Sequence, residues 1–241
     1  MVENLNDILV IGHKGAGDIV PENTLKAFKK AIELNADYIE FDIHITKDNE
    51  IVIIHDADTI RTAGTSGVIK NMTLLEVKEL DVGEGENIPT LNELIELAKG
   101  KIGLQIEIKA EGIVEHLPEI LKRNDLDMSS IISSFSFEEL LKLKKIEPTL
   151  KLGYLLPEPL QRPRLIKRLT QKAIDNNFYA VHPHFNVVNK DFVQFAHENK
   201  LKVNVWTVND REIMKNLIEF GVDGIITDDI SLANELLGRK T

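Results

Sequence analysis

The sequence predicts an α/β protein whose fold is a (β/α)8 TIM barrel with a small insertion after the second strand region. Segments with the spacing of strands and of helices alternate from one end of the 241 residues to the other. They make up about eight β/α units, the number that closes a barrel. No linker or low-complexity tract interrupts them, so we expect residues 1–241 to form a single domain. An open doubly wound sheet is the alternative, because alternation alone does not establish closure.

The first part of the chain contains two predicted strands, a helix between them and a hairpin. Apolar, β-rich runs predict strands at 8–13 and 38–46, and the second of these has a hairpin partner at 50–55. A Pro-Glu-Asn-Thr start signal at 21–24 precedes apolar residues with helical spacing, so we expect a helix at 24–34.

A polar, glycine-containing stretch at 56–87 follows the hairpin and interrupts the alternation. We interpret it as an insertion at about 57–88, with one short helix near 74–80. Regular alternation resumes after it. Helices are predicted at 91–98, 114–122, 137–145, 165–175, 192–198, 212–220 and 232–237, and strands at 102–109, 130–135, 152–156, 179–184, 202–208 and 224–227.

Charge and composition narrow the class of partner. The formal net charge of −10 argues against nucleic acid and against a stable association with anionic membranes, so we expect a small-molecule substrate. The absence of cysteine excludes a disulfide framework and a thiol nucleophile. We recognise no signal peptide and no membrane-spanning stretch, and therefore expect a cytoplasmic protein. The sequence leaves the oligomeric state open.

Three carboxylates are predicted to share the inner face of the barrel. Glu40 and Asp42 lie at alternate positions of one strand, and Glu107 has the same orientation in the next, followed two residues later by Lys109. Buried charges are costly unless they are paired or bind a metal, and clustered carboxylates suit Mg²⁺ or Ca²⁺. A salt-bridge layer with Lys109 is the structural alternative.

Two histidines lie at predicted strand ends. His13 ends the first strand, and His55 follows the apolar run of the hairpin. Imidazole titrates near neutral pH, so these residues are candidates for an acid and a base beside the carboxylate cluster.

The candidate residues belong to a series of short motifs that extends over nearly the whole chain. The series is His13-Lys14-Gly15, Pro21-Glu22-Asn23-Thr24, Glu40-Phe41-Asp42-Ile43, Thr46-Lys47-Asp48, His55-Asp56, Ile88-Pro89-Thr90-Leu91, Ile106-Glu107-Ile108-Lys109, Trp206-Thr207-Val208-Asn209 and Val222-Asp223-Gly224-Ile225-Ile226-Thr227-Asp228. In content and order, these motifs resemble those of the glycerophosphodiester phosphodiesterase family.

The resemblance implies a barrel hydrolase that cuts glycerophosphodiesters into glycerol phosphate and an alcohol. It implies one divalent cation, Mg²⁺ or Ca²⁺ with Mn²⁺ as a further option, bound by the three carboxylates. His13 and His55 would be the acid/base pair, Lys109 would contact the phosphate, and Trp206 would line the substrate pocket, although core packing is nearly as good an interpretation of the tryptophan. Lys14 replaces the family's usual arginine and would still contact phosphate, as a point charge rather than a two-pronged donor.

Two other functions remain as alternatives. A lysophospholipase D or a phosphatidylinositol-type phosphodiesterase could use similar machinery, although the polar insertion favours a soluble substrate. A non-catalytic barrel that binds a ligand is the other, and the intact set of histidines and carboxylates argues against it.

A few further polar residues have supporting places in this scheme. Arg61 would steady the insertion or reach the substrate, and Asp228 would organise the mouth of the barrel. His44 is expected behind a ligand, and His182 and His184 at a strand end are more consistent with a local structural role than with substrate contact.

Overall fold

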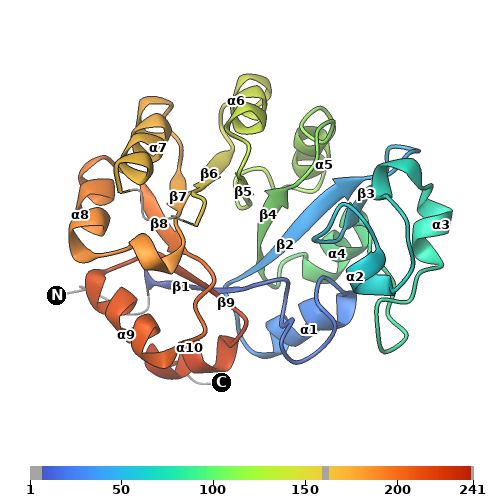
Figure 1. Ribbon diagram of the computed structural model, residues 1–241, viewed down its shortest axis with the longest axis horizontal. Helices are drawn as coiled ribbons and strands as arrows, with labels where there is room; N and C mark the ends of the chain where they lie inside the picture. The colour runs from blue at the N-terminus through green and yellow to red at the C-terminus, as the bar shows by residue number, and fades with distance from the viewer. Residues whose placement is uncertain (1–6, 159–162, 240–241) are drawn as a thin grey trace.

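The computed structural model describes residues 7–158 and 163–239, and within them eight parallel strands form a barrel surrounded by helices (Figure 1). The strands are β1 (Leu9–Gly12), β2 (Tyr38–Ile45), β4 (Gly103–Ile108), β5 (Ile131–Ser134), β6 (Lys151–Leu155), β7 (Ala180–His182), β8 (Lys202–Val205) and β9 (Gly224–Thr227).

Closure of the sheet follows from the two partners of β1. Leu9 pairs in register with Gly224 of β9, and on the other side Ile11 pairs with Tyr38 of β2. The remaining strands pair with their neighbours in chain order, apart from the hairpin strand β3 (Ile51–Ile53), which lies antiparallel to β2. The predicted TIM barrel is confirmed, and the open sheet is excluded.

Capping residues mark several of the helix ends. Those around the barrel are α1 (Leu25–Glu33), α4 (Leu91–Ala98), α5 (Leu117–Arg123), α6 (Phe137–Ile146), α7 (Pro163–Asp175), α8 (Lys190–Glu198), α9 (Arg211–Phe220) and α10 (Ile230–Leu236). The Thr24 hydroxyl accepts a hydrogen bond from the Ala27 backbone and starts α1, and Gly221, in a left-handed conformation with φ of 82°, ends α9. No helix in the described ranges is long and apolar enough to cross a membrane.

The insertion between β3 and α4 contains more structure than the sequence predicted. The expected short helix is α3 (Leu74–Lys78), but α2 (Ile60–Ala63) and the 3₁₀ helix η2 (Ile69–Asn71) precede it. Both are too short for a helical period to be recognisable. A small apolar cluster of its own anchors the segment, formed by Val52, Ile54, Ile69, Val77, Val82 and Ile88.

Several predicted boundaries were wrong at the ends of elements. The helix expected from 114 begins at Leu117, because Ile113 and Val114 lie in the preceding turns. The strand expected to reach 184 ends at His182 and is followed by the 3₁₀ helix η3 (Phe185–Val187), while β8 ends at Val205 rather than at 208. That residues 1–241 form a single domain stays a prediction.

Alternation along the strands separates an apolar outer face from an unusually polar inner face. Outward residues pack under the helices, as Phe41 does against Phe28 of α1, with ring centroids 5.8 Å apart. On the inner face the buried residues include Gln105, Ser133, His182 and Asn204. Burial lowers the pKa of His182 to about 3, so the ring is neutral.

Glycine makes room for these inward side chains. A Cβ atom at Gly153 would lie 2.4 Å from Nε2 of His182, which is fully buried. We therefore expect Gly153→Ala to lower the free energy of unfolding by about 1–3 kcal/mol, the usual cost of overpacking a core.

Denaturant unfolding measures this cost, and a double-mutant cycle tests its cause. In the background of His182→Ala, the same glycine substitution should cost less than half as much, because the ring it collides with is gone. An equal cost in both backgrounds would contradict the steric explanation.

Candidate active site

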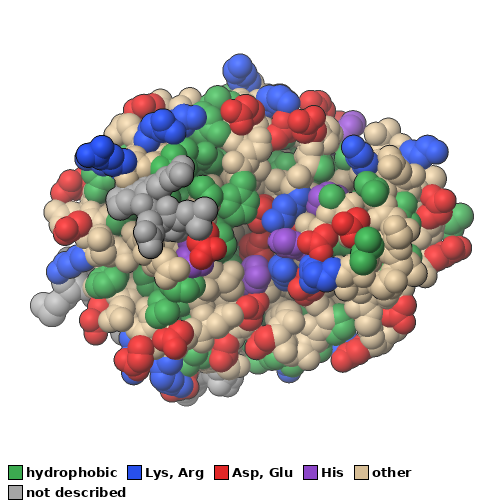
Figure 2. All heavy atoms as spheres, viewed as in Figure 1, with side chains coloured by type: hydrophobic (Ala, Val, Ile, Leu, Met, Phe, Trp, Pro, Cys, Tyr) green, Lys and Arg blue, Asp and Glu red, His purple; other side chains and the backbone are tan. Residues whose placement is uncertain are grey.

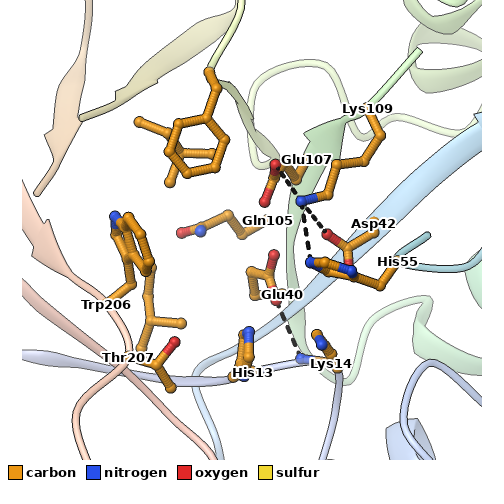
Figure 3. A pocket seen from close by; sticks show the side chains of 13 residues that line it. His13, Lys14, Glu40, Asp42, His55, Gln105, Glu107, Lys109, Trp206 and Thr207 are labelled. Carbon is orange, nitrogen blue, oxygen red and sulfur yellow. Dashed lines mark hydrogen bonds and ion pairs between the residues drawn. The ribbon is translucent and has the colours of Figure 1, made fainter. Parts of the chain in front are cut away.

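A pocket of about 220 Å³ opens at the C-terminal ends of the strands. Figure 2 shows basic, acidic and histidine side chains gathered around a hollow near the middle of this face, with hydrophobic side chains beside them. The pocket is lined by His13, Lys14, Glu40, Asp42, His55, Gln105, Glu107, Lys109, Phe135, Leu155, Trp206, Thr207 and Ile226. Every residue that the sequence predicted for the site is in this set, and Figure 3 shows how they converge.

The carboxylates of Glu40, Asp42 and Glu107 form the buried part of the pocket. Asp42 of β2 is paired in register with Glu107 of β4, and Glu40 lies two residues earlier on the same face of β2. One oxygen of each carboxylate lies within 4.8 Å of the others. This arrangement results directly from the parallel register of β2 and β4.

Lys109 neutralises only part of this charge. Its ammonium lies 3.2 Å from Oδ1 of Asp42 and 2.7 Å from Oε1 of Glu107. Burial and the neighbouring Asp42 raise the pKa of Glu40 to about 7 and that of Glu107 to about 8. Burial alone would also raise the pKa of Asp42, but Lys109 lowers it. The salt bridge expected as an alternative is therefore present, yet one ammonium cannot offset three carboxylates, and an oxygen-binding cation could take the place of the protons that the raised pKa values retain.

His13 lies just beyond β1 and is held through its Nδ1 atom. Nδ1 is 2.7 Å from Oδ1 of Asp228, which follows β9. Asp228 is held in turn by Asn209, whose Nδ2 donates to Oδ2 at 2.6 Å and whose Oδ1 accepts from the Asp228 backbone N–H at 3.0 Å. Burial alone would lower the pKa of His13, but Asp228 and the Glu40 carboxylate outweigh burial and raise it.

His55 has a similar partner and a second, cationic neighbour. Its Nδ1 is 2.7 Å from Oδ1 of Asp56, and its Nε2 is 3.4 Å from the Lys109 ammonium. An ammonium group can only donate, so Nε2 carries the lone pair and Nδ1–H donates to Asp56. The backbone oxygen of His55 is 3.2 Å from Nε2 of His44, so His44 holds the segment that contains His55. That His44 supports a metal ligand stays a prediction.

Lys14 reaches the pocket by an unusual backbone conformation. Its φ of 52° is in the left-handed region, and its backbone N–H donates to Oε2 of Glu40 at 3.1 Å. The Lys14 ammonium lies 3.3 Å from both carboxylate oxygens of Glu22, in the loop before α1. The pocket is thus reached by both the main chain and the side chain of this residue.

The opposite wall of the pocket is aromatic and apolar. The Trp206 indole N–H donates to the His182 carbonyl at 2.7 Å, and the Trp206 ring meets Phe135 edge to face at 5.6 Å. His182 itself is fully buried, and His184 packs against the indole from a position outside the pocket lining. Trp206 therefore both packs and lines the pocket.

Sequence reasoning missed several lining residues: Gln105, Phe135, Leu155, Thr207 and Ile226. Gln105 carried a usable signal, since it precedes Glu107 by two residues and so shares its face of the strand. Phe135 follows β5 and carried none, because an aromatic residue at the end of a strand is ordinary core composition.

Comparison with known proteins agrees with the resemblance. The chain matches the model of the glycerophosphoryl diester phosphodiesterase family over residues 13–232. It is 42% identical over 235 residues to a glycerophosphodiester phosphodiesterase of Caldanaerobacter subterraneus subsp. tengcongensis, an alignment that covers 92% of this chain and 94% of that protein.

Solved structures share the whole fold. A glycerophosphodiester phosphodiesterase from Thermotoga maritima superposes with a TM-score of 0.80 at 31% identity, covering 95% of this chain and 98% of that one. A phosphodiesterase from Oleispira antarctica, solved in complex with the product sn-glycerol-3-phosphate, superposes with a TM-score of 0.85 at 27% identity over 98% of this chain and all of its own. On the family match and the 42% identity to a full-length relative, the chain belongs to the glycerophosphoryl diester phosphodiesterase family.

Proposed function

We propose that the protein hydrolyses glycerophosphodiesters to glycerol phosphate and an alcohol, with a divalent cation and a pair of histidines. One observation carries this proposal: the same pocket contains two histidines and a buried cluster of three carboxylates, and each histidine is hydrogen-bonded to an aspartate. The product found in the Oleispira antarctica relative is the product expected here.

Glu40, Asp42 and Glu107 would hold the cation, and the convergence of their buried oxygens beside a single ammonium supports this assignment. When bound, a divalent cation polarises a non-bridging phosphate oxygen and offsets the charge that develops there. Mg²⁺, Ca²⁺ and Mn²⁺ all accept oxygen ligands of this kind.

The two histidines divide the proton transfers. His55 is the base, because its Nε2 lone pair faces the pocket while Nδ1–H is held by Asp56. It takes the proton of the nucleophile as the new oxygen–phosphorus bond forms. Water as the nucleophile gives glycerol phosphate directly, whereas the neighbouring glycerol hydroxyl gives a cyclic phosphate that water then opens in a second step. His13 is the acid, because Asp228 favours its protonated ring. It donates from Nε2 to the alcohol oxygen as that oxygen leaves phosphorus.

The remaining side chains bind and orient the substrate. Lys109, beside both the carboxylates and His55, and Lys14, at the mouth, supply positive charge for the phosphodiester. Phe135 and Trp206 form the aromatic wall of the pocket, which suits the less polar part of the substrate.

The proposal is tested by turnover with and without a cation. Glycerophosphocholine should yield glycerol phosphate in a coupled assay, EDTA should abolish this, and Mg²⁺, Ca²⁺ or Mn²⁺ added to the dialysed protein should restore it. Undiminished turnover in EDTA contradicts the cation. A higher kcat/KM on lysophosphatidylcholine would favour a lysophospholipase D, and no turnover on any diester would favour a binding protein.

Replacing either histidine should abolish chemistry without loss of folding. We expect His13→Ala and His55→Ala each to lower kcat by roughly 10²–10⁴-fold, the usual contribution of a proton-transfer group. His116→Ala, at an exposed histidine outside the pocket, is the control and should leave kcat unchanged. Activity within a few-fold of the unmodified protein would remove that histidine from the mechanism.

The carboxylate cluster should make the metal-free protein less stable as the pH rises. Glu107 has a pKa of about 8 when folded and an ordinary value of 4.5 when unfolded. Between these values the folded protein holds a proton that the unfolded chain has released, so the free energy of unfolding falls with increasing pH.

Urea unfolding of the metal-free protein and of Glu107→Gln from pH 5 to pH 8.5 measures this effect. The stability of the unmodified protein relative to the variant should decline across the range and level off above about pH 8, as the titration is completed. Mg²⁺ should stabilise the unmodified protein most at the upper end, because it binds the ionised carboxylates. A stability difference that does not change with pH would contradict the raised pKa.

A further inference from the structure

Each histidine of the pocket is held by an aspartate, and each aspartate is held by a further side chain. For His13 that further side chain is Asn209, which holds Asp228. For His55 it is Arg61 of the insertion, which holds Asp56. The two arrangements differ in charge, since an amide holds one aspartate and a guanidinium the other.

Arg61 uses two edges of its guanidinium for two separate segments of the chain. Its Nε lies 2.5 Å from Oδ2 of Asp56, and one of its terminal nitrogens lies 2.6 Å from Oε1 of Glu22. Burial alone would raise the pKa of Asp56, but the hydrogen bonds from His55 and Arg61 lower it to about 2. The planar fork of arginine makes both contacts at once, which a lysine ammonium could not do with the same geometry.

The backbone that presents Arg61 is fixed by the insertion's own contacts. Thr59, fully buried just before α2, donates through its hydroxyl to the Thr65 carbonyl at 2.6 Å and through its N–H to the Gly67 carbonyl at 3.0 Å. The Ile69 N–H donates to the Ala57 carbonyl at 3.0 Å, and the Ile69 side chain is buried in the insertion's apolar cluster. Arg61 therefore extends from a closed loop rather than from a free one.

Arg61 itself is not among the pocket-lining residues, and 51% of its side chain is exposed. Its contacts end at Asp56, which touches His55, and at Glu22, which touches Lys14. Any effect on the reaction must therefore pass through these two carboxylates.

We propose that Arg61 is a positioning residue for His55, acting through Asp56, and that its contact with Glu22 ties the insertion to the loop that carries Lys14. The inference rests on the proposed function, because it assumes that His55 transfers a proton. Without Arg61, the partly exposed Asp56 carboxylate can turn toward solvent, and the His55 ring then loses the partner that fixes its orientation and tautomer.

The test is a comparison of kcat and KM for Arg61→Gln on glycerophosphocholine with saturating Mg²⁺. We expect kcat to fall roughly 10–100-fold, the usual cost of removing a partner that orients a functional side chain, while KM stays within about threefold. Arg211→Gln is the matched control, since Arg211 also grips a carboxylate, that of Glu235, on the surface between α9 and α10. It should leave both constants unchanged.

A double variant shows whether Arg61 acts through Asp56. Asp56→Asn alone should lower kcat at least as much as Arg61→Gln, and the two substitutions combined should be no worse than Asp56→Asn alone. Additive losses would overturn the proposal, as would an unchanged kcat in Arg61→Gln. A raised KM with unchanged kcat would also overturn it and would make Arg61 a substrate contact.

His55→Ala, measured in the same series, separates this inference from the function on which it rests. If His55→Ala keeps its activity, the proposed role of the histidine fails, and the role of Arg61 fails with it. If His55→Ala is inactive while Arg61→Gln is fully active, the inference about Arg61 fails alone. Thermal unfolding of Arg61→Gln should match that of Arg211→Gln within a few degrees, so that a loss of kcat reflects positioning rather than loss of folded protein.

Discussion

The burial of three carboxylates around a single ammonium is the constraint on which the site depends. Glu40, Asp42 and Glu107 are almost fully buried, and Lys109 contacts only the last two. Such a cluster is costly for a fold unless further positive charge enters it. The three carboxylates lie at the mouth of the barrel, where a cation can enter from solvent. Between the strands and the surrounding helices, the packing is apolar.

The loops around this cluster make the pocket two-sided. On one side lie the two histidines and Lys14, in the segments that follow β1 and β3. The left-handed backbone conformation of Lys14 directs its N–H at Glu40. On the other side, Phe135 and Trp206 form a wall that is held by the hydrogen bond from the indole to the His182 carbonyl. A phosphodiester has a charged centre and two substituents, and a pocket divided in this way presents a different surface to each side of such a molecule.

The strands and the carboxylate cluster could be predicted from the sequence because their signals are periodic. Alternation places Glu40 and Asp42 on one face of their strand and Glu107 on the corresponding face of the next, and short β-rich segments between helical patterns mark the barrel strands. The contacts of Arg61 and the partnership of His13 with Asp228 could not be predicted in this way. They depend on side-chain directions across loops and on residues 215 positions apart, and neither leaves a period in the sequence. The two short helical turns of the insertion were missed for the same reason, since each is stabilised by tertiary contacts and not by a repeated pattern.

The great sequence separation between His13 and Asp228 has a consequence for how the protein matures. The histidine directly follows the first strand of the barrel and its aspartate directly follows the last, and the two meet only when β1 pairs with β9. During synthesis from the N-terminus, a chain could have assembled the carboxylate cluster of β2 and β4 and the pair of His55 with Asp56 while this contact was still missing. The contact that holds the proposed acid, His13, is then the last part of the pocket to be completed. On the proposed mechanism, a barrel that lacks β9 would contain the three carboxylates but no partner for His13, so hydrolysis would begin only when the sheet closes.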